Sequence, residues 1–505
     1  MKHTLTFGNA LQALHKAGLL QTNPPLPLSK AISLVTDNSK AVVPDTVFIC
    51  KGAAFRPTYL AEAEGLGACC YVSETAYPSS PLPCLLVSDV RAAMALLAAL
   101  FYDYPSQALT AVGITGTKGK TTAAYFLREM LLVFEAAQNK PAPAFLSSIV
   151  TYNGADESPS KLTTPEPLEV QRILRTAADN GCRYAVMEVS SQALKYGRVA
   201  HTHFAAGVYL NIGEDHVGPN EHPNAEDYFQ SKLMLFHQST VACVNLDGHG
   251  SERALLAAQS APRVLTYSMR LPAADVYAER IEKTKAGLCF HVTTPRFKIQ
   301  IDLPMAGLFN VSNALAAITA AEALGLNKNS IVAGLAVAAV PGRMETYYSA
   351  DEHIAVLVDY AHNPMSLQAL IESARQEFAN RELTVVFGCT GNKGLSRRKP
   401  MGEVAGRLAD RIFLTEDDPA TEHVLDICNE IAAGSSKPCA IVPDRAQAVE
   451  QAILGCSRPA VILVAGKGAE TIQKRKNGSE TFPGDRALVA QALAKADALI
   501  RHNVK

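Results

Sequence analysis

Short apolar runs alternate with amphipathic segments along almost the whole chain. In the first two thirds, three runs have the length and composition of buried strands and end in polar or glycine-rich residues: Leu109–Thr115, Tyr184–Val189 and Gly207–Asn211. The segment Thr121–Phe134 instead repeats large apolar side chains at helical spacing. Because strands that alternate with helices build parallel sheets, the pattern predicts an α/β fold with largely parallel sheets.

A second series of apolar runs begins after Val340-Pro341-Gly342. Its strand candidates are Ile354–Asp359, Leu383–Gly388, Arg411–Thr415, Ala440–Pro443 and Ala460–Gly466. In open α/β sheets, ligands bind at the carboxyl ends of the strands. The polar and glycine-rich clusters that follow most of these runs are therefore expected to line a site.

We expect three domains, with boundaries near Pro105 and Gly342. Residues 1–105 are predicted to form a small α/β domain, residues 106–342 a central P-loop ATPase-like domain with a parallel sheet, and residues 343–505 a Rossmann-like α/β domain. The length of 505 residues supports such a division, because it exceeds what one compact core usually holds.

Composition excludes several classes of protein. Hydrophobic residues make up 48% of the chain and charged residues 19%, which is typical of a globular protein. The 47 Lys and Arg balance the 48 Asp and Glu, so a broad nucleic-acid footprint is not expected. The longest apolar run, Ala92–Leu100, is shorter than the roughly 20 residues of a membrane span, so no membrane partner is expected either.

The N-terminus and the cysteines indicate a cytoplasmic protein. Residues 1–20 have no continuous apolar centre, so we expect no signal peptide. The 11 cysteines are scattered and form no CxxC pair, which argues against zinc and iron–sulfur sites. An odd number of cysteines in a chain of this size fits reduced thiols better than a disulfide framework.

The clearest motif is GITGTKGKTT at residues 113–122, between a predicted strand and a predicted helix. Glycines let backbone N–H groups turn toward phosphate oxygens, and the helix N-terminus adds positive partial charge. The Lys side chain can reach the outer phosphates, and the first Thr hydroxyl can bind Mg²⁺. The motif predicts ATP binding by Gly116, Thr117, Lys118, Gly119, Lys120, Thr121 and Thr122. Isoleucine replaces the first glycine of the strict pattern, at Ile114.

Three more polar residues are expected near the same sheet edge. Glu188 ends a strand and could hold Mg²⁺, although such an acid can also simply cap a helix. His216 follows the next strand and is either a ligand or a structural loop histidine. Lys232, on a predicted helix, would ordinarily be solvated. The nearby phosphate loop favours a functional role for all three.

Together these residues resemble the Mur ligase family of peptidoglycan precursor synthesis. The resemblance covers nearly the whole chain and rests on TGTKGKTT (115–122), EVSS (188–191), NIGEDH (211–216), Lys232, Asn310 in LFNVSNALAA, Arg343 in VPGRME and DYAHNP (359–364). Within the family, the chain resembles the branch that adds the third peptide residue, through LTTP (162–165), GCTGNK (388–393), DDPA (417–420) and GKGAE (466–470).

The resemblance implies a two-step ligation. ATP phosphorylates the γ-carboxylate of D-Glu in UDP-MurNAc-L-Ala-D-Glu, and the amine of an amino acid then displaces the phosphate. Because two anions must meet in the first step, cations are needed to offset their repulsion. The resemblance implies Mg²⁺ held by Glu188 and His216, besides Thr121, and it implies that Lys232 is carbamylated to N6-carboxylysine. The catalytic residues would be Lys120, Glu188, His216 and Lys232.

The resemblance also assigns substrate contacts. Further contacts to ATP fall on Asn310, Arg343 and Asp359. Contacts to the UDP-substrate, whose uridine would bind residues 1–105, fall on Ser39, Thr163, Thr164, Ser190 and Arg198. Contacts to the incoming amino acid fall on Lys393, Asp417, Asp418, Pro419, Ala420, Gly466 and Glu470.

The acceptor motif favours L-lysine. Relatives that add meso-diaminopimelate carry Asp-Asn-Pro-Arg, whose arginine pairs with the distal carboxylate. Here Ala420 offers no charge, and Asp418 places an anion that favours a side-chain ammonium. Ornithine stays open as a close analogue of lysine, and meso-diaminopimelate stays open because Lys467 or Arg397 could replace the missing arginine.

A non-catalytic nucleotide-binding homologue is the alternative from another class. Loss of chemistry usually removes the metal and phosphate residues, whereas all of them are present in this chain. We therefore expect an enzyme that acts as a monomer and closes its third domain on the central one.

Overall fold

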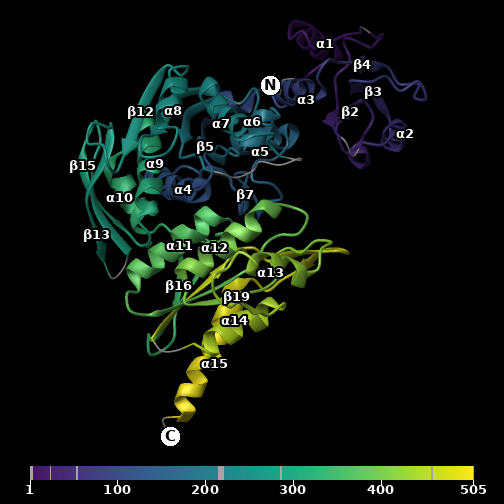
Figure 1. Ribbon diagram of the computed structural model, residues 1–505. Helices are drawn as coiled ribbons and strands as arrows, with labels where there is room; N and C mark the ends of the chain where they lie inside the picture. Colours follow the sequence, from purple (N-terminus) through teal and green to yellow (C-terminus); the bar gives the residue numbers. More distant parts are fainter. Residues whose placement is uncertain are drawn as a thin grey trace.

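The computed structural model describes residues 4–22, 24–52, 55–213, 221–284, 287–456 and 459–503. Within these ranges the first sheet is parallel, with four strands in the order β1-β2-β3-β4. Its strands are β1 (Leu34–Thr36), β2 (Thr46–Ile49), β3 (Ala68–Ser73) and β4 (Cys84–Leu86). Its helices are α1 (Phe7–Lys16), α2 (Pro57–Gly65) and α3 (Val90–Phe101), with the 3₁₀ turn η1 (Ser39–Ala41). Figure 1 shows this part set apart from the rest of the molecule, which it approaches through α3, the helix that contacts α5 (Pro167–Asp179).

The helix α3 joins the first sheet to the central one. Asp89 caps it by accepting hydrogen bonds from the N–H groups of Arg91 (2.8 Å) and Ala92 (2.9 Å). Its apolar face, with Met94 and Leu97, is fully buried in the core of the first sheet. The short turn η2 (Pro105–Gln107) then leads into the central sheet.

The central sheet has eleven strands within the described ranges, in the order β15-β14-β13-β12-β11-β10-β5-β9-β6-β7-β8. Its strands are β5 (Thr110–Thr115), β6 (Ala144–Leu146), β7 (Val150–Tyr152), β8 (Glu157–Pro159), β9 (Tyr184–Glu188), β10 (Phe204–Tyr209), β11 (Ser239–Asn245), β12 (Arg263–Ser268), β13 (Val276–Thr284), β14 (Gly287–Thr293) and β15 (Lys298–Leu303). Its helices are α4 (Lys120–Ala136), α5 (Pro167–Asp179), α6 (Ser191–Lys195), α7 (Ala225–Leu233), α8 (Ser251–Ala258), α9 (Phe309–Ala323) and α10 (Lys328–Ala336), with the 3₁₀ turn η3 (Met234–Gln238).

The predicted parallel arrangement is confirmed for the middle of this sheet, where β10 pairs in parallel with β5 and β11. Neither end of the sheet was predicted. The strands β13-β14-β15 at one end and β6-β7-β8 at the other pair antiparallel. In β15 every second residue is buried, as in a strand that faces water on one side. The prediction relied on continuous apolar runs, and such an alternating strand lacks one.

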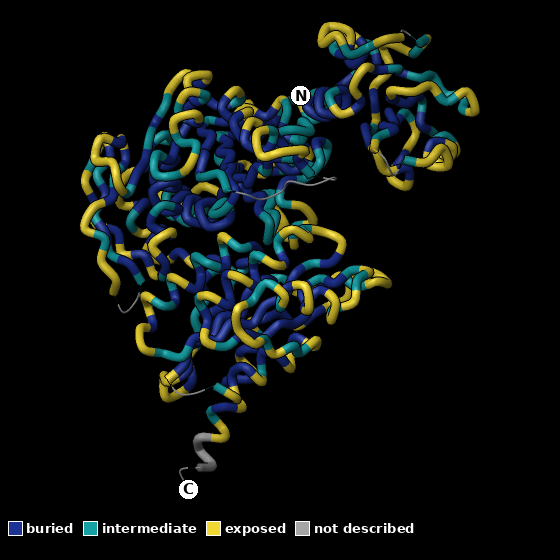
Figure 2. Tube along the Cα trace, viewed as in Figure 1, coloured by how far each residue is buried: buried dark blue, intermediate teal, exposed yellow. Residues whose placement is uncertain are grey.

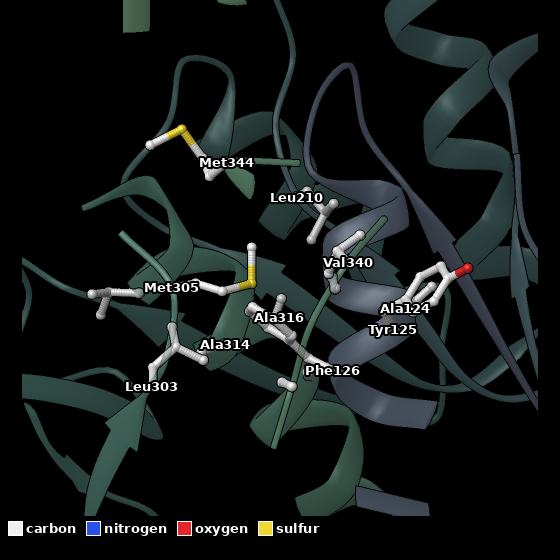
Figure 3. Close-up of a cluster of buried hydrophobic side chains, with 14 of the residues drawn as sticks. Ala124, Tyr125, Phe126, Leu210, Leu303, Met305, Ala314, Ala316, Val340 and Met344 are labelled. Atoms are coloured by element: carbon white, nitrogen blue, oxygen red, sulfur yellow. The ribbon is translucent and has the colours of Figure 1, made fainter. Parts of the chain in front are cut away.

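Helices α4, α9 and α10 cover one face of the central sheet. Figure 3 shows Phe126 of α4 among apolar side chains that include Ala314 and Ala316 of α9 and Val340, which follows α10. The helices approach closely, since a Cβ at Gly334 of α10 would lie 2.5 Å from the backbone of Met130. This packing fixes α4, whose N-terminus follows the phosphate loop.

The third sheet has six strands within the described ranges, in the order β16-β17-β21-β18-β19-β20. Its strands are β16 (Glu345–Tyr348), β17 (Ile354–Asp359), β18 (Glu382–Phe387), β19 (Arg411–Leu414), β20 (Ala440–Ile441) and β21 (Ala460–Ala465), and β22 (Ile472–Arg475) and β23 (Gly478–Thr481) form a hairpin beside it. Its helices are α11 (Pro364–Glu377), α12 (Arg398–Leu408), α13 (Val424–Ala432), α14 (Arg445–Leu454) and α15 (Asp485–Asn503), with the 3₁₀ turn η4 (Leu395–Arg397). All five predicted strands are present here.

Figure 1 shows α11 and α12 on the side of the third sheet that faces the central part, while α14 and α15 lie on its far side. Figure 2 shows the trace buried along the sheets and exposed mainly along the peripheral loops and helix surfaces. In the described part of the chain, no helix combines the length and the apolar character needed to cross a bilayer.

Candidate active site

The phosphate loop lies between β5 and α4, as the sequence predicts. Gly119 precedes the helix with φ of 86°, in the left-handed region that favours glycine. A Cβ on Gly119 would also lie 2.2 Å from Oδ1 of Asn313 on α9, so a larger residue has no room here. Glycine therefore lets the loop lie directly against α9.

Asn211, which follows the neighbouring strand β10, holds the loop in place. Its side chain accepts from Lys118 N (2.9 Å) and donates to Lys118 O (3.1 Å), and its carbonyl accepts from Thr117 N (3.1 Å). The Lys120 ammonium lies over the loop and donates to the Gly116 carbonyl at 2.9 Å. A loop fixed in this way, with a cation over it, suits a polyphosphate.

A chain of oxygen atoms continues from the loop to β9. The hydroxyls of Thr121 and Ser148 are 3.0 Å apart, and Ser148 N donates to Glu188 Oε1 at 2.7 Å. Glu188 is only 1% exposed. Arg343, after the central sheet, places Nη2 3.4 Å from Thr121 Oγ1. Thr121 and Glu188 offer the oxygen donors that Mg²⁺ prefers, so this donor set fits that ion. His216 lies outside the described residues.

Lys232, on α7, is 1% exposed and is therefore not the solvated lysine that its sequence alone allowed. Its ammonium lies 4.2 Å from the centre of the Tyr228 ring. Tyr228 in turn donates from its hydroxyl to Thr117 Oγ1 at 3.1 Å. Sequence analysis missed Tyr228, although its place one helical turn before Lys232 puts both on the same face of α7.

Asn310 and Asp359 approach the same region from two sides. Asn310 is buried near the start of α9, where its Nδ2 donates to the Ala306 carbonyl at 2.6 Å. Asp359 ends β17 and accepts from Met344 N at 2.9 Å. Burial raises the pKa of the Asp359 carboxyl, and the nearby Arg343 guanidinium partly opposes this rise.

All the residues assigned to the UDP-substrate except Ser39 lie near the carboxyl end of β9. The Thr164 hydroxyl donates to the Glu188 carbonyl (2.9 Å) and accepts from Ser190 N (3.0 Å). Arg198 donates to the Thr164 carbonyl at 3.2 Å and lies 2.9 Å from a Glu166 carboxylate oxygen. Thr163, next to Thr164, is half-buried. These contacts join residues that are far apart in the sequence.

A cavity of about 160 Å³ opens between the first and central sheets. It is lined by Lys51, Arg91, Met94, Glu166, Pro167, Tyr196 and Arg198. Three cations and one carboxylate line it. Lys51 Nζ lies 2.7 Å from Glu166 Oε2 and 3.3 Å from Asp37 Oδ2, and Arg198 pairs with the same Glu166, so three cations meet two carboxylates. The surplus of positive charge favours an anionic ligand.

Ser39 does not line this cavity. Its hydroxyl donates to Glu62 Oε2 at 2.6 Å. A second cavity, of about 630 Å³, lies at the carboxyl ends of β2, β3 and β4, and its lining includes Phe55 and Tyr77, whose ring centres are 5.4 Å apart. Sequence analysis did not single out these two rings.

Three loops at the carboxyl edge of the third sheet form the predicted acceptor region. Gly391 N donates to the Asp418 carbonyl at 2.8 Å, and a Cβ on Gly466 would lie 2.7 Å from Asp417 Oδ2. These two contacts bring the loops after β18, β19 and β21 together. Lys393 is exposed and Pro419 is buried at the edge of this group. Ala420 has φ of 52° and donates from its N–H to the Lys474 carbonyl at 3.0 Å.

Lys467 lies at the centre of this region and is fully buried. Its ammonium lies 2.8 Å from Asp418 Oδ1, 2.9 Å from Glu470 Oε2 and 2.7 Å from the Ile472 carbonyl oxygen. Sequence analysis named Lys467 only as a possible replacement for the missing arginine. The GKG run was the available signal, but no pattern in the sequence indicates which carboxylates meet the lysine.

Two further groups in this region have altered pKa values. Burial raises the pKa of the Asp417 carboxyl to about 6, against the opposing effect of Lys467 and Arg445. The Tyr360 hydroxyl donates to Glu470 Oε1 at 2.9 Å, and burial raises the pKa of Tyr360 strongly. The region thus contains three carboxyl groups, from Asp417, Asp418 and Glu470, around one buried lysine.

The chain is similar to known proteins along most of its length. The chain matches the Mur ligase middle domain over residues 114–321 and the Mur ligase glutamate ligase domain over residues 342–468. It is 39% identical to a UDP-N-acetylmuramyl-tripeptide synthetase of Lactobacillus acidophilus, covering 93% of each chain. It is 39% identical to a UDP-N-acetylmuramoyl-L-alanyl-D-glutamate–L-lysine ligase of Enterococcus faecalis, covering 92% of each.

Solved structures are similar over the whole chain. A UDP-N-acetylmuramoyl-L-alanyl-D-glutamate–2,6-diaminopimelate ligase superposes with a TM-score of 0.67 at 25% identity, covering 99% of this chain and 100% of that one. A MurF ligase of Thermotoga maritima, solved with ADP, has the same fold with a TM-score of 0.60 at 18% identity, covering 94% and 99%. With both of its ligase domains matched and such relatives along nearly all of its length, the chain belongs to the Mur ligase family of ATP-dependent ligases.

Proposed function

We propose that this ligase adds L-lysine to the γ-carboxylate of D-Glu in UDP-MurNAc-L-Ala-D-Glu, with ATP as the co-substrate. The observation that carries the proposal is the acceptor region, in which the carboxyl groups of Asp417, Asp418 and Glu470 lie around the buried Lys467 ammonium. The nearby Arg445 is also buried, but it is paired with Asp485, so the carboxyl groups remain in surplus. Such a surplus of carboxylates attracts a side-chain ammonium and repels a second carboxylate. Relatives named as L-lysine ligases, at 37–39% identity, support the same acceptor.

The distal carboxylate of meso-diaminopimelate would need a cation. Lys467 was one candidate, but its ammonium is already bound to Asp418, Glu470 and a backbone carbonyl. Ala420 supplies no charge. We therefore keep meso-diaminopimelate as the poorer acceptor. Ornithine carries the same side-chain ammonium as L-lysine and stays open as an alternative, to be tested beside it.

In the proposed first step, the phosphate loop binds ATP and the substrate carboxylate attacks its terminal phosphorus, which forms an acyl phosphate and releases ADP. The acceptor's amine displaces the phosphate in the second step. Lys120 and Arg343 lie where they can offset the negative charge that develops on the transferred phosphoryl group. Thr121, Glu188 and His216 would hold Mg²⁺. When bound, this ion neutralises phosphate charge and holds the phosphoryl group in line for transfer.

Lys232 is proposed to act as N6-carboxylysine. Carbamylation would turn the buried ammonium into a carboxylate, and that anion could help to orient the metal. The position of Lys232 beside Tyr228, whose hydroxyl binds the phosphate loop, supports a role close to the phosphates.

The UDP-substrate is proposed to bind across the first and central sheets. Thr163, Thr164, Ser190 and Arg198 would contact its peptide or sugar end, and Ser39 its uridine end. The cationic cavity between the sheets supports the placement of an anionic substrate there. In the second step, Lys393 would hold the acceptor's α-carboxylate and Glu470 an amine, with Asp417, Asp418, Pro419, Ala420 and Gly466 completing the site.

We further propose domain boundaries near residues 105 and 342. Between them lie the strands of the central sheet, with those of the first sheet before and those of the third after. A cytoplasmic monomer is also proposed, because all substrates of this reaction are small molecules.

The test is phosphate release by the purified protein with ATP, Mg²⁺ and UDP-MurNAc-L-Ala-D-Glu, comparing L-lysine, L-ornithine and meso-diaminopimelate. Release that depends on L-lysine is the expected result. Release with meso-diaminopimelate alone would contradict the acceptor assignment, and release with none of the three would contradict the ligase reaction itself.

A further inference from the structure

A buried hydrogen-bonded bridge connects the ATP loop with the first turn of α6. Its central residue is His222, which is fully buried. One ring nitrogen, Nδ1, lies 2.5 Å from Asp227 Oδ2, and the other, Nε2, lies 2.9 Å from Ser191 Oγ. Neither the proposed reaction nor the assigned substrate contacts use this histidine.

The order Ser–His–Asp resembles a hydrolytic triad, but the surroundings exclude that role. Ser191 is only 4% exposed and is the first residue of α6, so its hydroxyl cannot reach a substrate carbonyl. Burial lowers the pKa of His222, which favours the neutral ring. A neutral ring donates from one nitrogen to Asp227 and accepts from Ser191 with the other, so it joins two elements.

The elements that His222 joins carry proposed site residues. Ser191 directly follows Ser190, whose Oγ caps α6 by accepting from Ala193 N at 3.2 Å. Asp227 belongs to the first turn of α7, the helix that carries Lys232, and it also binds Lys195 at the end of α6 at 2.7 Å. Helices α6 and α7 are thus held together at both ends of α6.

Tyr228 extends the bridge to the phosphate loop. Its ring centre lies 5.1 Å from that of His222, and its hydroxyl donates to Thr117 Oγ1 at 3.1 Å. Tyr228 is 1% exposed, so movement of this ring must displace its neighbours. A change at Thr117 when phosphates bind therefore has a direct path to Ser191.

We propose that His222 and Tyr228 are positioning residues that couple the ATP phosphate loop to the N-terminus of α6. The UDP-substrate end of this coupling rests on the proposed function. Nucleotide binding orders the first turn of α6, which places Ser190 for the substrate. Nucleotide binding therefore raises the affinity for the UDP-substrate. By linkage, the UDP-substrate raises the affinity for the nucleotide by the same factor.

Hydrogen exchange of the α6 amides Ala193 and Leu194 tests the bridge without any UDP-substrate. With the β,γ-methylene analogue of ATP, exchange in the wild-type protein is expected to slow by at least about fivefold, the lower end of usual coupling. In Tyr228→Phe and in Ser191→Ala, the analogue is expected to slow exchange by less than about twofold. The double variant is expected to lose no more of the slowing than either single variant, because both changes break the same bridge. Tyr267→Phe is the matched control, because it removes another buried hydroxyl, bound to the Tyr209 carbonyl at 3.1 Å.

Three results would overturn the bridge. The analogue could fail to slow exchange at Ala193 and Leu194 in the wild-type protein, it could slow exchange in Tyr228→Phe as much as in the wild-type protein, or Tyr267→Phe could lose as much of the slowing as Tyr228→Phe. A second arm measures the affinity for UDP-MurNAc-L-Ala-D-Glu with and without the analogue. If the wild-type protein does not bind this substrate while the exchange result holds, the proposed function fails and the bridge stands. If lysine-dependent phosphate release holds but Tyr228→Phe leaves exchange unchanged, the bridge alone fails.

Discussion

Arg343 reaches from the segment that enters the third sheet to Thr121 on the phosphate loop, with Nη2 and Oγ1 3.4 Å apart. The same guanidinium stacks on the ring of Tyr360, at 4.5 Å from its centre. Tyr360 donates to Glu470 in the acceptor region. One short series of contacts therefore connects the ATP loop with the loop that is proposed to bind the incoming amine.

Replacing Arg343 by lysine should reduce turnover far more than stability. Lysine keeps the charge but loses the planar fork that reaches Thr121 while stacking on Tyr360. We expect kcat to fall by about 10²-fold or more, as when a donor to a developing anion is removed. Steady-state phosphate release checks this, with Arg381→Lys as the control, because Arg381 stacks on Phe378 away from the site. An equal loss in both variants would contradict the assignment.

The double variant Lys120→Ala with Lys232→Ala should abolish ATP turnover and leave the fold intact. Lys120 lies on the phosphate loop, with its ammonium 2.9 Å from the Gly116 carbonyl oxygen. Lys232 lies beside Tyr228, whose hydroxyl binds the same loop. Circular dichroism and phosphate release would be measured together. Lys298→Ala with Lys328→Ala removes two exposed lysines and serves as the control. Unchanged turnover in the first double variant would contradict the site assignment.

Asp417 should make the protein less stable as the pH rises from about 4 to about 6. Its pKa is about 6 in the folded protein against an ordinary value of 3.8, so the folded state binds more protons within that window. Where the folded state binds more protons, the free energy of unfolding falls as the pH rises. A difference of about two units corresponds to about 3 kcal/mol, a cost that is complete above pH 6.

The variant Asp417→Asn removes this titration. It should resemble the wild-type protein in stability near pH 4 and exceed it at pH 8, while losing lysine-dependent activity. Urea unfolding at several pH values would measure the difference, with Asp426→Asn, at an exposed position, as the control. A wild-type pH dependence that the Asn variant fully retains would show that Asp417 is not its source.

Scattering should report closure of the third domain. Arg343 already contacts Thr121 at the start of α4, and substrates bound on both sides would add contacts between the two domains. We expect the radius of gyration to fall when ATP analogue and UDP-substrate are both present. A radius that stays the same with both ligands bound would contradict domain closure.

The sequence predicted those elements of the fold that leave a local pattern of apolar and polar residues. Buried parallel strands are continuous apolar runs, so β17, β18 and β21 were predicted, and the polar residues after them fell at one edge. The antiparallel ends of the central sheet were not predicted: β14 and β15 alternate in burial, and β7 and β8 are three-residue strands without a buried residue. Contacts such as Lys467 with Asp418, or Tyr228 with Thr117, join residues 49 and 111 positions apart, and no local pattern encodes them.

Loss of one partner of the buried pair Arg445–Asp485 should destabilise the third domain. Both side chains are about fully buried, at 1% and 0% exposure, and they meet through two contacts of 2.7 and 2.8 Å. Asp485 begins α15, and Arg445 also donates to the Ala465 carbonyl at 2.9 Å, so the pair ties α14, α15 and β21 together.

Asp485→Asn should therefore cost about 3–5 kcal/mol, because it leaves the arginine charge buried without its counter-ion. The double variant Arg445→Met with Asp485→Leu should cost less than Asp485→Asn alone, since no charge then remains buried. Lys495→Ala breaks the exposed pair with Glu450, of similar length at 2.7 Å, and should change stability by less than about 1 kcal/mol. Denaturant unfolding of the four proteins would decide. A double variant at least as unstable as Asp485→Asn would mean that packing, and not charge, makes the pair necessary.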